Sequence, residues 1–302
     1  MSDQSLLITN ALICNESRVI AGDVLVRRGR IDRVAREIPA GRVDRIIDAG
    51  GKYLLPGFID DQVHFREPGL THKGDMATES AAAVAGGITS FMDMPNTIPN
   101  ATKRAVLMDK YRLARGRAKA NFSFYFGAAN DNLDEIRALQ PGDCCGVKVF
   151  MGASTGNMLV DDPETLERIF ADCPTLIATH CEDTPTIKAN EERYREQYGD
   201  DVPFSAHPLI RSEEACWKST VLATTLAKRH GTRLHVLHLT TAKELELFEP
   251  GPLNGKRITA EVCAHMLHFD DRDYEKKGAF IKCNPAIKTA ADRKALIAGL
   301  ID

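Results

Sequence analysis

The chain has 302 residues, of which 43% are hydrophobic and 27% charged, with a formal net charge of −3 at pH 7. These values are typical of a soluble globular protein of one large domain or two ordinary ones. The small negative charge gives no electrostatic case for binding nucleic acid or an anionic membrane. No apolar run has membrane-spanning length, and the N-terminus lacks the features of an export signal. Eight cysteines without C-x-x-C spacing indicate reduced thiols, so we expect a cytoplasmic protein.

Residues 1–54 are predicted to form a small β domain. Segments 6–9, 18–35 and 44–50 alternate apolar with polar residues, as strands with one buried face do. Three glycines interrupt this pattern and are typical of turns: Gly22, Gly29 and Gly41. The stretch "GKYLLPGFIDDQVHF" then becomes almost continuously apolar, which indicates a strand buried on both faces.

From residue 55 to residue 302, predicted strands alternate with predicted helices. The strands are expected at 58–63, 88–92, 122–126, 146–150, 176–179, 234–237 and 258–262. The helices are expected at 72–87, 103–118, 132–140, 162–173, 211–231, 242–249 and 289–302. This alternation predicts an α/β fold with a parallel sheet, most economically a (β/α)8 TIM-type barrel. Only seven of its eight strands can be found, so the eighth strand is missing from the chain as given.

The residues at the strand ends carry the chemistry of this prediction, because active sites of such barrels lie at the C-terminal ends of the strands. Those ends hold His64, Asp93, Lys148, His180 and His238. A single histidine of this kind is more often a hydrogen-bonded core residue than a ligand. Three of them at strand ends of one barrel favour a metal site, and imidazole ligands suit zinc.

Six motifs occur in order along nearly the whole chain: "PGFIDDQVHFREPG", "MPNTIPN", "GVKVFMGASTGNM", "IATHCED", "HVLHLT" and "NPAIK". Together they resemble the dihydroorotases of the cyclic amidohydrolase superfamily. Hydantoinases, dihydropyrimidinases and allantoinases share much of this scaffold and stay open as alternatives.

The resemblance implies a set of metal ligands. In the family the first strand ends in D-x-H-x-H, and its two histidines bind one metal; His64 matches the second histidine, whereas Gln62 occupies the place of the first. Lys148 matches a lysine that is commonly carboxylated and bridges two metals, and His180 and His238 match the ligands of the second metal. The resemblance therefore implies one or two zinc ions per subunit.

Gln62 leaves the occupancy of this centre open, because its neutral amide oxygen is a weaker zinc ligand than an imidazole nitrogen. A weaker first metal, a single-metal enzyme and a catalytically silent relative are all compatible with this substitution.

The remaining motifs are expected to hold the substrate. By resemblance, Arg66 and Asn96 bind a substrate carboxylate, and Asn284 lies near the pyrimidine ring. Taken singly, Asn96 and Asn284 could also be turn formers next to prolines. The implied function is a homo-oligomeric dihydroorotase that interconverts dihydroorotate and N-carbamoyl-L-aspartate in pyrimidine biosynthesis. The alternative from another class is a non-catalytic dihydroorotase-like subunit.

The family's catalytic aspartate, at the end of strand eight, has no counterpart in the chain, so the catalytic residue stays unassigned. Asp302 would lie at the wrong end of that strand, and Asp93 has no such role in the family. We expect the natural protein to continue past Asp302, and the 302 residues alone to be nearly inactive and poorly soluble. His235 is expected to point away from His238. His265 is a candidate neighbour of the ligands, and the other histidines are expected to be structural: His72, His207, His230 and His268.

Overall fold

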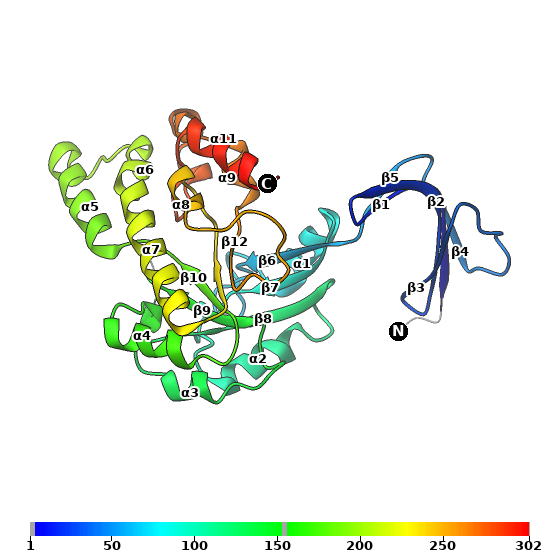
Figure 1. Cartoon of the computed structure of the whole chain (residues 1–302), viewed down its shortest axis with the longest axis horizontal. Helices are drawn as coiled ribbons and strands as arrows, with labels where there is room; N and C mark the ends of the chain where they lie inside the picture. The colour runs from blue at the N-terminus through cyan, green and yellow to red at the C-terminus, as the bar shows by residue number, and fades with distance from the viewer. Residues whose placement is uncertain (1–3, 153–155, 302) are drawn as a thin grey trace. The chain divides into compact units, whose positions relative to one another are not determined.

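A computed structural model of the chain describes residues 4–152 and 156–301 (Figure 1). It divides into two compact units, residues 1–59 and residues 60–302. Part of the "GVKVFMGASTGNM" motif, residues 153–155, and Asp302 lie outside the described residues. Within the described chain, no helix combines the length and apolar character needed to cross a membrane.

The first unit is a small sheet, as predicted. Its strands are β1 (Ser5–Asn15), β2 (Arg18–Arg27), β3 (Arg30–Ala35), β4 (Arg45–Asp48) and β5 (Tyr53–Leu54). The order is β3-β2-β1-β4, with β5 also pairing with β1; β2 is antiparallel to both β1 and β3, whereas β4 and β5 run parallel to β1. A small core of Leu7, Leu25 and Ile38 holds the sheet together.

The turn prediction at Gly22 is wrong. This glycine lies inside β2, where a Cβ atom would come within 2.6 Å of the Ala35 carbonyl oxygen of β3. Its lack of a side chain therefore serves a close approach between strands. Gly29, by contrast, has a φ of 72° in the turn between β2 and β3, as the pattern predicts.

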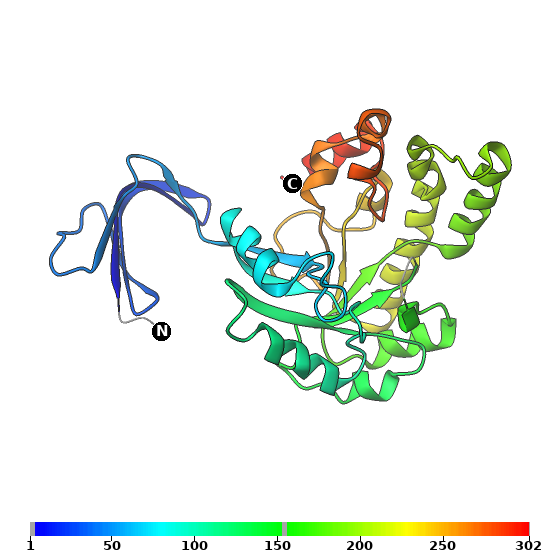
Figure 2. The ribbon, with the colours of Figure 1, turned by 180° about the vertical axis from the view of Figure 1, so that it is seen from behind.

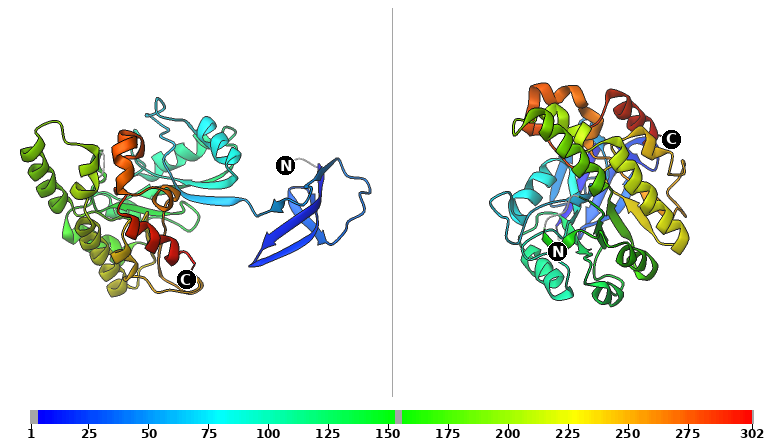
Figure 3. Two further views of the ribbon diagram at one scale, coloured as in Figure 1. Left: turned by 90° about the horizontal axis from the view of Figure 1, so that it is seen from above. Right: turned by 90° about the vertical axis from the view of Figure 1, so that its left-hand side faces the viewer.

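The second unit is built on seven parallel strands that follow the predicted positions closely. They are β6 (Phe58–Val63), β7 (Ile88–Asp93), β8 (Asn121–Gly127), β9 (Gly146–Phe150), β10 (Ile177–His180), β11 (Leu234–Val236) and β12 (Ile258–Ala260). Their order in the sheet is their order in the chain, as expected for successive right-handed βα units. The sheet is curled in the manner of a TIM-type barrel, with the helices outside it (Figures 2 and 3), which confirms the predicted fold class.

Helices cover the outer face of this sheet. Every predicted helical segment contains one: α1 (Met76–Ala85), α2 (Arg104–Ala114), α3 (Leu133–Arg137), α4 (Pro163–Asp172), α7 (Glu213–His230), α8 (Ala242–Leu245) and α11 (Ala290–Gly299). Three short helices lie in the loops: α6 (His207–Ile210), α9 (Ala264–His268) and α10 (Tyr274–Lys277). The helical faces pack on a core that includes Phe91, Leu107, Phe124, Val147 and Ile169.

One long helix, α5 (Thr184–Tyr198), was not predicted. Ile187 is its only fully buried residue, so the segment has no apolar face for a periodicity search to detect. The sequence features that indicate this helix are at its start. The Asp183 carboxylate accepts a hydrogen bond from the Thr186 amide, and Pro185 lies in the first turn.

The curl of the sheet brings its first and last strands together. Cys263 Sγ, which follows β12, lies 3.7 Å from Gln62 Oε1 of β6. His235 Nε2 of β11 lies 3.6 Å from Asp61 Oδ2, also of β6. Residues about 200 positions apart in the chain are therefore neighbours at the edge where the strands end.

Candidate functional site

Two histidines form the centre of the site. His180 is the last residue of β10, and His238 follows β11 by two residues; both are buried, and His180 Nδ1 lies 3.1 Å from His238 Nε2. His238 has a φ of 44°, a left-handed backbone conformation that is uncommon for a residue with a side chain. Such strain concentrates at functional sites. Nδ1 of His180 and Nε2 of His238 are thus close enough to bind one metal ion together.

A buried carboxylate orients His180. Glu182 Oε2 lies 2.7 Å from His180 Nε2 and accepts a hydrogen bond of 2.5 Å from Arg211. A carboxylate at Nε2 favours the proton on that nitrogen, so the Nδ1 lone pair is directed toward His238. Metal-binding histidines are commonly held this way. Glu182 was overlooked in the sequence, although it lies inside the quoted motif "IATHCED".

The histidines of the site are uncharged at neutral pH. Burial lowers the pKa of His180, and burial, together with the neighbouring His180 and Lys148, lowers that of His238 well below its usual value. Burial, with Arg66 nearby, lowers the pKa of His64 to about 3. Neutral imidazole has the free lone pair that a metal ion requires. The effects on the pKa of His238 also indicate that Lys148 and His64 lie near the His180–His238 pair.

Lys148, in the fully buried strand β9, is 1% exposed. Its Nζ lies 4.5 Å from the centre of the Phe150 ring, and no carboxylate of the described residues lies within ion-pair distance. Burial lowers the pKa of Lys148 to about 7. A substantial fraction of the amine is therefore neutral at physiological pH, and the neutral amine is the form that can react with carbon dioxide.

The predicted substrate residues lie on three segments: Arg66 follows β6, Asn96 follows β7, and Asn284 precedes α11. His64 Nδ1 lies 2.9 Å from Asn96 Oδ1, so Asn96 adjoins the cluster. Arg66 is half-buried with a φ of 66°, and no acidic side chain in residues 4–152 or 156–301 forms an ion pair with it. Gln62 contacts Cys263, as described above. Asn284 is exposed, in the loop before α11.

Asp93 does not line the mouth of the barrel. Its Oδ1 accepts a hydrogen bond of 2.8 Å from the Phe65 amide, and its Oδ2 pairs at 2.7 Å with Lys110 of α2. Both charged side chains are fully buried. Because Phe65 lies between His64 and Arg66, this ion pair holds the chain at the point where those two side chains enter the site. The role of Lys110 was not visible in the sequence.

Two of the remaining histidines make structural hydrogen bonds, and a third faces carboxylates. His207 Nε2 lies 2.8 Å from the Cys283 carbonyl oxygen, and His230 Nε2 lies 2.6 Å from a Glu167 oxygen. His235 instead faces the carboxylates of Asp61 and Glu261.

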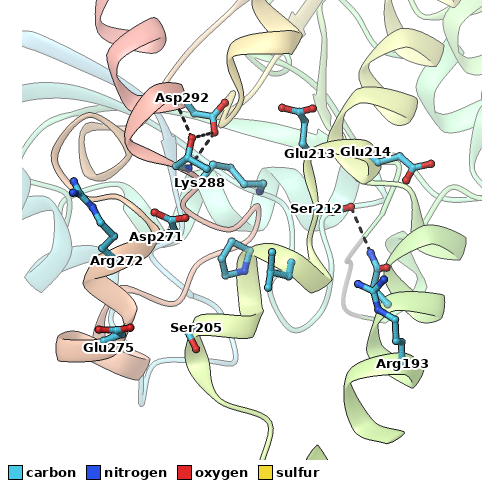
Figure 4. A pocket seen from close by; sticks show the side chains of 14 residues that line it. Arg193, Ser205, Ser212, Glu213, Glu214, Asp271, Arg272, Glu275, Lys288 and Asp292 are labelled. Carbon is cyan, nitrogen blue, oxygen red and sulfur yellow. Dashed lines mark hydrogen bonds between the residues drawn. The ribbon is translucent and has the colours of Figure 1, made fainter. Parts of the chain in front are cut away.

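A cavity of about 590 Å³ lies beside the "NPAIK" segment (Figure 4). Lys288 contributes to its wall and is itself buried, with Nζ donating to the Ala286 carbonyl at 2.9 Å and to Thr240 Oγ1 at 3.3 Å. The wall also includes Arg193, Ser205, Ser212, Glu213, Glu214, Asp271, Arg272, Glu275 and Asp292. None of the predicted metal or substrate residues lines it, so it is separate from the histidine cluster.

Comparison with known proteins places this geometry in a family. Residues 51–139 match the family model described as Dihydro-orotase-like. The chain is 33% identical to the dihydroorotase of Methanosarcina acetivorans over 98% of its own length and 64% of that protein. It is 32% identical to the allantoinase of Streptomyces avermitilis over 100% of its length and 68% of that protein.

A solved structure agrees with these sequence matches. The L-hydantoinase of Arthrobacter aurescens superposes with a TM-score of 0.89 at 28% identity, over 96% of this chain and 65% of that one. The chain thus spans about two thirds of the length of its relatives. The identity to the allantoinase over more than two thirds of that protein, together with the shared fold, shows that the chain belongs to the cyclic amidohydrolases, which include dihydroorotases, hydantoinases and allantoinases.

Proposed function

We propose that this protein has dihydroorotase activity, hydrolysing the ring amide of dihydroorotate or forming it from N-carbamoyl-L-aspartate. The observation that carries this proposal is Arg66, a half-buried guanidinium just past the end of β6; among the described residues no carboxylate lies within ion-pair distance of it, and Asp93 acts on its pKa only from farther away. A substrate carboxylate would supply that partner in a bidentate geometry. The proposal includes a small-molecule substrate, a cytoplasmic homo-oligomer and a place in pyrimidine biosynthesis.

The donor set fits zinc. His180 Nδ1 and His238 Nε2 are 3.1 Å apart and uncharged, which is the state needed for binding one ion between them. A carboxylated Lys148 would add an anionic oxygen ligand, and His64 would add a further imidazole. Bound zinc would polarise the amide carbonyl and lower the pKa of a water molecule. The protein itself would hold the ligands through Glu182 and Asp93 and bind the substrate through Arg66 and Asn96.

The test joins a metal count with a substrate comparison. Purified protein is analysed for zinc and assayed with dihydroorotate, hydantoin and allantoin. We expect bound zinc and turnover of dihydroorotate in preference to the other two compounds. Preference for hydantoin or allantoin would replace the proposed substrate. A folded protein with neither metal nor turnover would favour a non-catalytic subunit, the interpretation that Gln62 supports.

Arg66→Met is expected to raise the KM for dihydroorotate by at least about tenfold, since one charge-assisted hydrogen bond contributes about 1.5–3 kcal/mol. Methionine keeps much of the side-chain volume but removes the cation. Arg66→Lys serves as the matched variant and should recover part of the loss, because it restores the charge without the two-pronged donor. Steady-state kinetics measures both. An unchanged KM in Arg66→Met would remove Arg66 from the substrate site.

Gln62→His is expected to tighten zinc binding at the first metal position, because it restores an imidazole beside His64. The affinity is measured by competition with a chromophoric chelator. Gln62→Ala is the control, since it removes the contact with Cys263 without adding a ligand. Equal zinc stoichiometry and affinity in wild type, Gln62→His and Gln62→Ala would mean that position 62 does not face the metal.

A further inference from the structure

The Arg66 loop, residues 66–70 after β6, is anchored by its second residue. Glu67 is 7% exposed, and both of its carboxylate oxygens have partners. Oε2 accepts a hydrogen bond of 2.8 Å from the Met76 amide at the start of α1, and Oε1 accepts one from the guanidinium of Arg117. This buried carboxylate therefore ties the loop both to α1 and to the turn that follows α2.

Arg117 is itself held in a fixed position. Its amide donates to the Ala114 carbonyl oxygen at 3.0 Å, which closes the turn after α2. Two residues further on, the Lys119 amide donates to Ser80 Oγ of α1, also at 3.0 Å. A second guanidinium nitrogen of Arg117 lies 3.8 Å from Asp75 Oδ1, at the N-cap of α1. The turn and α1 thus form one support for the buried carboxylate.

The Arg66 loop also packs against the loop after β7, which carries Asn96. The Ile98 amide donates to the Pro68 carbonyl oxygen at 3.0 Å, and a Cβ atom on Gly69 would overlap the Ile98 carbonyl oxygen. Gly69 also has a φ of 85°, so both its backbone conformation and the lack of space require glycine. A shift of one loop would therefore shift the other, together with the predicted substrate residue that it carries.

The placement of Glu67 matters for the charge of its chain neighbour, Arg66. The guanidinium of Arg66 lies near enough to His64 to lower the pKa of that histidine, whereas Glu67 faces Arg117. A Glu67 carboxylate released from Arg117 would have Arg66 as an adjacent cation. An ion pair between the two would occupy the guanidinium that a substrate carboxylate requires.

We propose that Arg117 is a positioning residue for substrate binding: by holding Glu67 it fixes the Arg66 loop and keeps Arg66 available for a carboxylate. This inference rests on the proposed function, in which Arg66 binds the substrate carboxylate. The ionic partners of Arg117 are Glu67 and Asp75 rather than residues of the histidine cluster. Loss of Arg117 should therefore weaken substrate binding and leave the chemistry at the metal centre unchanged.

Steady-state kinetics of the zinc-loaded protein with dihydroorotate tests the proposal. Arg117→Met is expected to raise the KM at least about threefold and to keep kcat within about twofold of wild type, since contacting residues of one network are coupled. Arg117→Lys should recover part of the KM because it restores the cation. Arg115→Met, which removes an exposed arginine of the same turn, is the matched control and should keep the KM of wild type. An unchanged KM in Arg117→Met, or a fall in kcat alone, would overturn the proposal.

A double variant tests whether the released carboxylate competes for Arg66. In Glu67→Gln with Arg117→Met, the glutamine can still accept a hydrogen bond from the Met76 amide but cannot form an ion pair with Arg66. The double variant should therefore have a lower KM than Arg117→Met alone. An equal or higher KM would contradict the proposal that Arg117 keeps Glu67 away from Arg66.

Hydrogen exchange separates this inference from the proposed function, because it needs no turnover. Peptides that cover residues 66–76 should exchange their amide hydrogens at least about threefold faster in Arg117→Met than in wild type or Arg115→Met, since the loop loses an anchor. Equal exchange in all three proteins would overturn the inference even if wild type hydrolyses dihydroorotate. Faster exchange in Arg117→Met, with a wild type that does not hydrolyse dihydroorotate, would support the anchor and remove only the proposed substrate.

Discussion

Lys148→Ala is expected to lower turnover of dihydroorotate by about a thousandfold, because loss of a metal ion removes several kcal/mol of transition-state stabilisation. The alanine has no amine to carboxylate, so the proposed metal centre would lose its anionic oxygen ligand. Metal analysis and steady-state kinetics of the same sample measure the effect. We expect at most one weakly held ion in the variant.

The matched control is Lys228→Ala, which removes an exposed lysine at the end of α7. It should keep both the metal content and the turnover of wild type. Circular dichroism should show that Lys148→Ala is folded, since burial already lowers the pKa of this amine and the substitution removes no ion pair with a described residue. Full metal content and full turnover in Lys148→Ala would show that the carboxylated-lysine assignment is wrong.

Lys110→Met is expected to lower the free energy of unfolding by about 3–5 kcal/mol, the usual cost of removing one partner from a buried ion pair. Asp93 would be left without its cation in a site with no exposure to solvent, where its carboxyl group must either stay charged or take up a proton, and both cost free energy. Urea denaturation followed by tryptophan fluorescence is well suited to the measurement. The single tryptophan, Trp217, lies in α7, so it reports on the unit formed by residues 60–302.

Two further variants make this prediction specific. Lys103→Met, at the exposed position just before α2, should change the stability by less than about 0.5 kcal/mol. The double variant Asp93→Asn with Lys110→Met should recover part of the loss, because the uncompensated charge is gone. A loss below about 1 kcal/mol in Lys110→Met would show that the ion pair does not hold β6 to α2 in the way its geometry indicates.

Much of the fold can be predicted from local patterns. Each of the seven parallel strands is a short apolar run, and most helices have one apolar face, so periodicity locates both. The parallel arrangement then places the strand-end residues at one edge, and this is why the amino-acid sequence alone groups His64, Lys148, His180 and His238. The polar helix α5 escapes detection because a helix without a buried face has no such period.

The contacts that give these residues their chemistry depend on the tertiary structure. His180 and His238 are 58 positions apart in the chain. Glu182 binds Nε2 of His180, and this leaves Nδ1 of the same ring to face His238. The sequence pattern offers no reason to pair Lys110 with Asp93, since a lysine on a helix is usually exposed.

His235 is the clearest example of a residue whose contacts the sequence does not predict. The sequence predicts only that it points away from His238, three positions further along the strand, yet it meets Asp61 and Glu261. By itself the sequence determined which segments form strands and which residues stand at their ends, because apolar period and residue type are local properties. Only the tertiary structure decided which of those side chains meet, because the curl of the sheet brings β6 to β11 and β12, and no local pattern encodes that curvature.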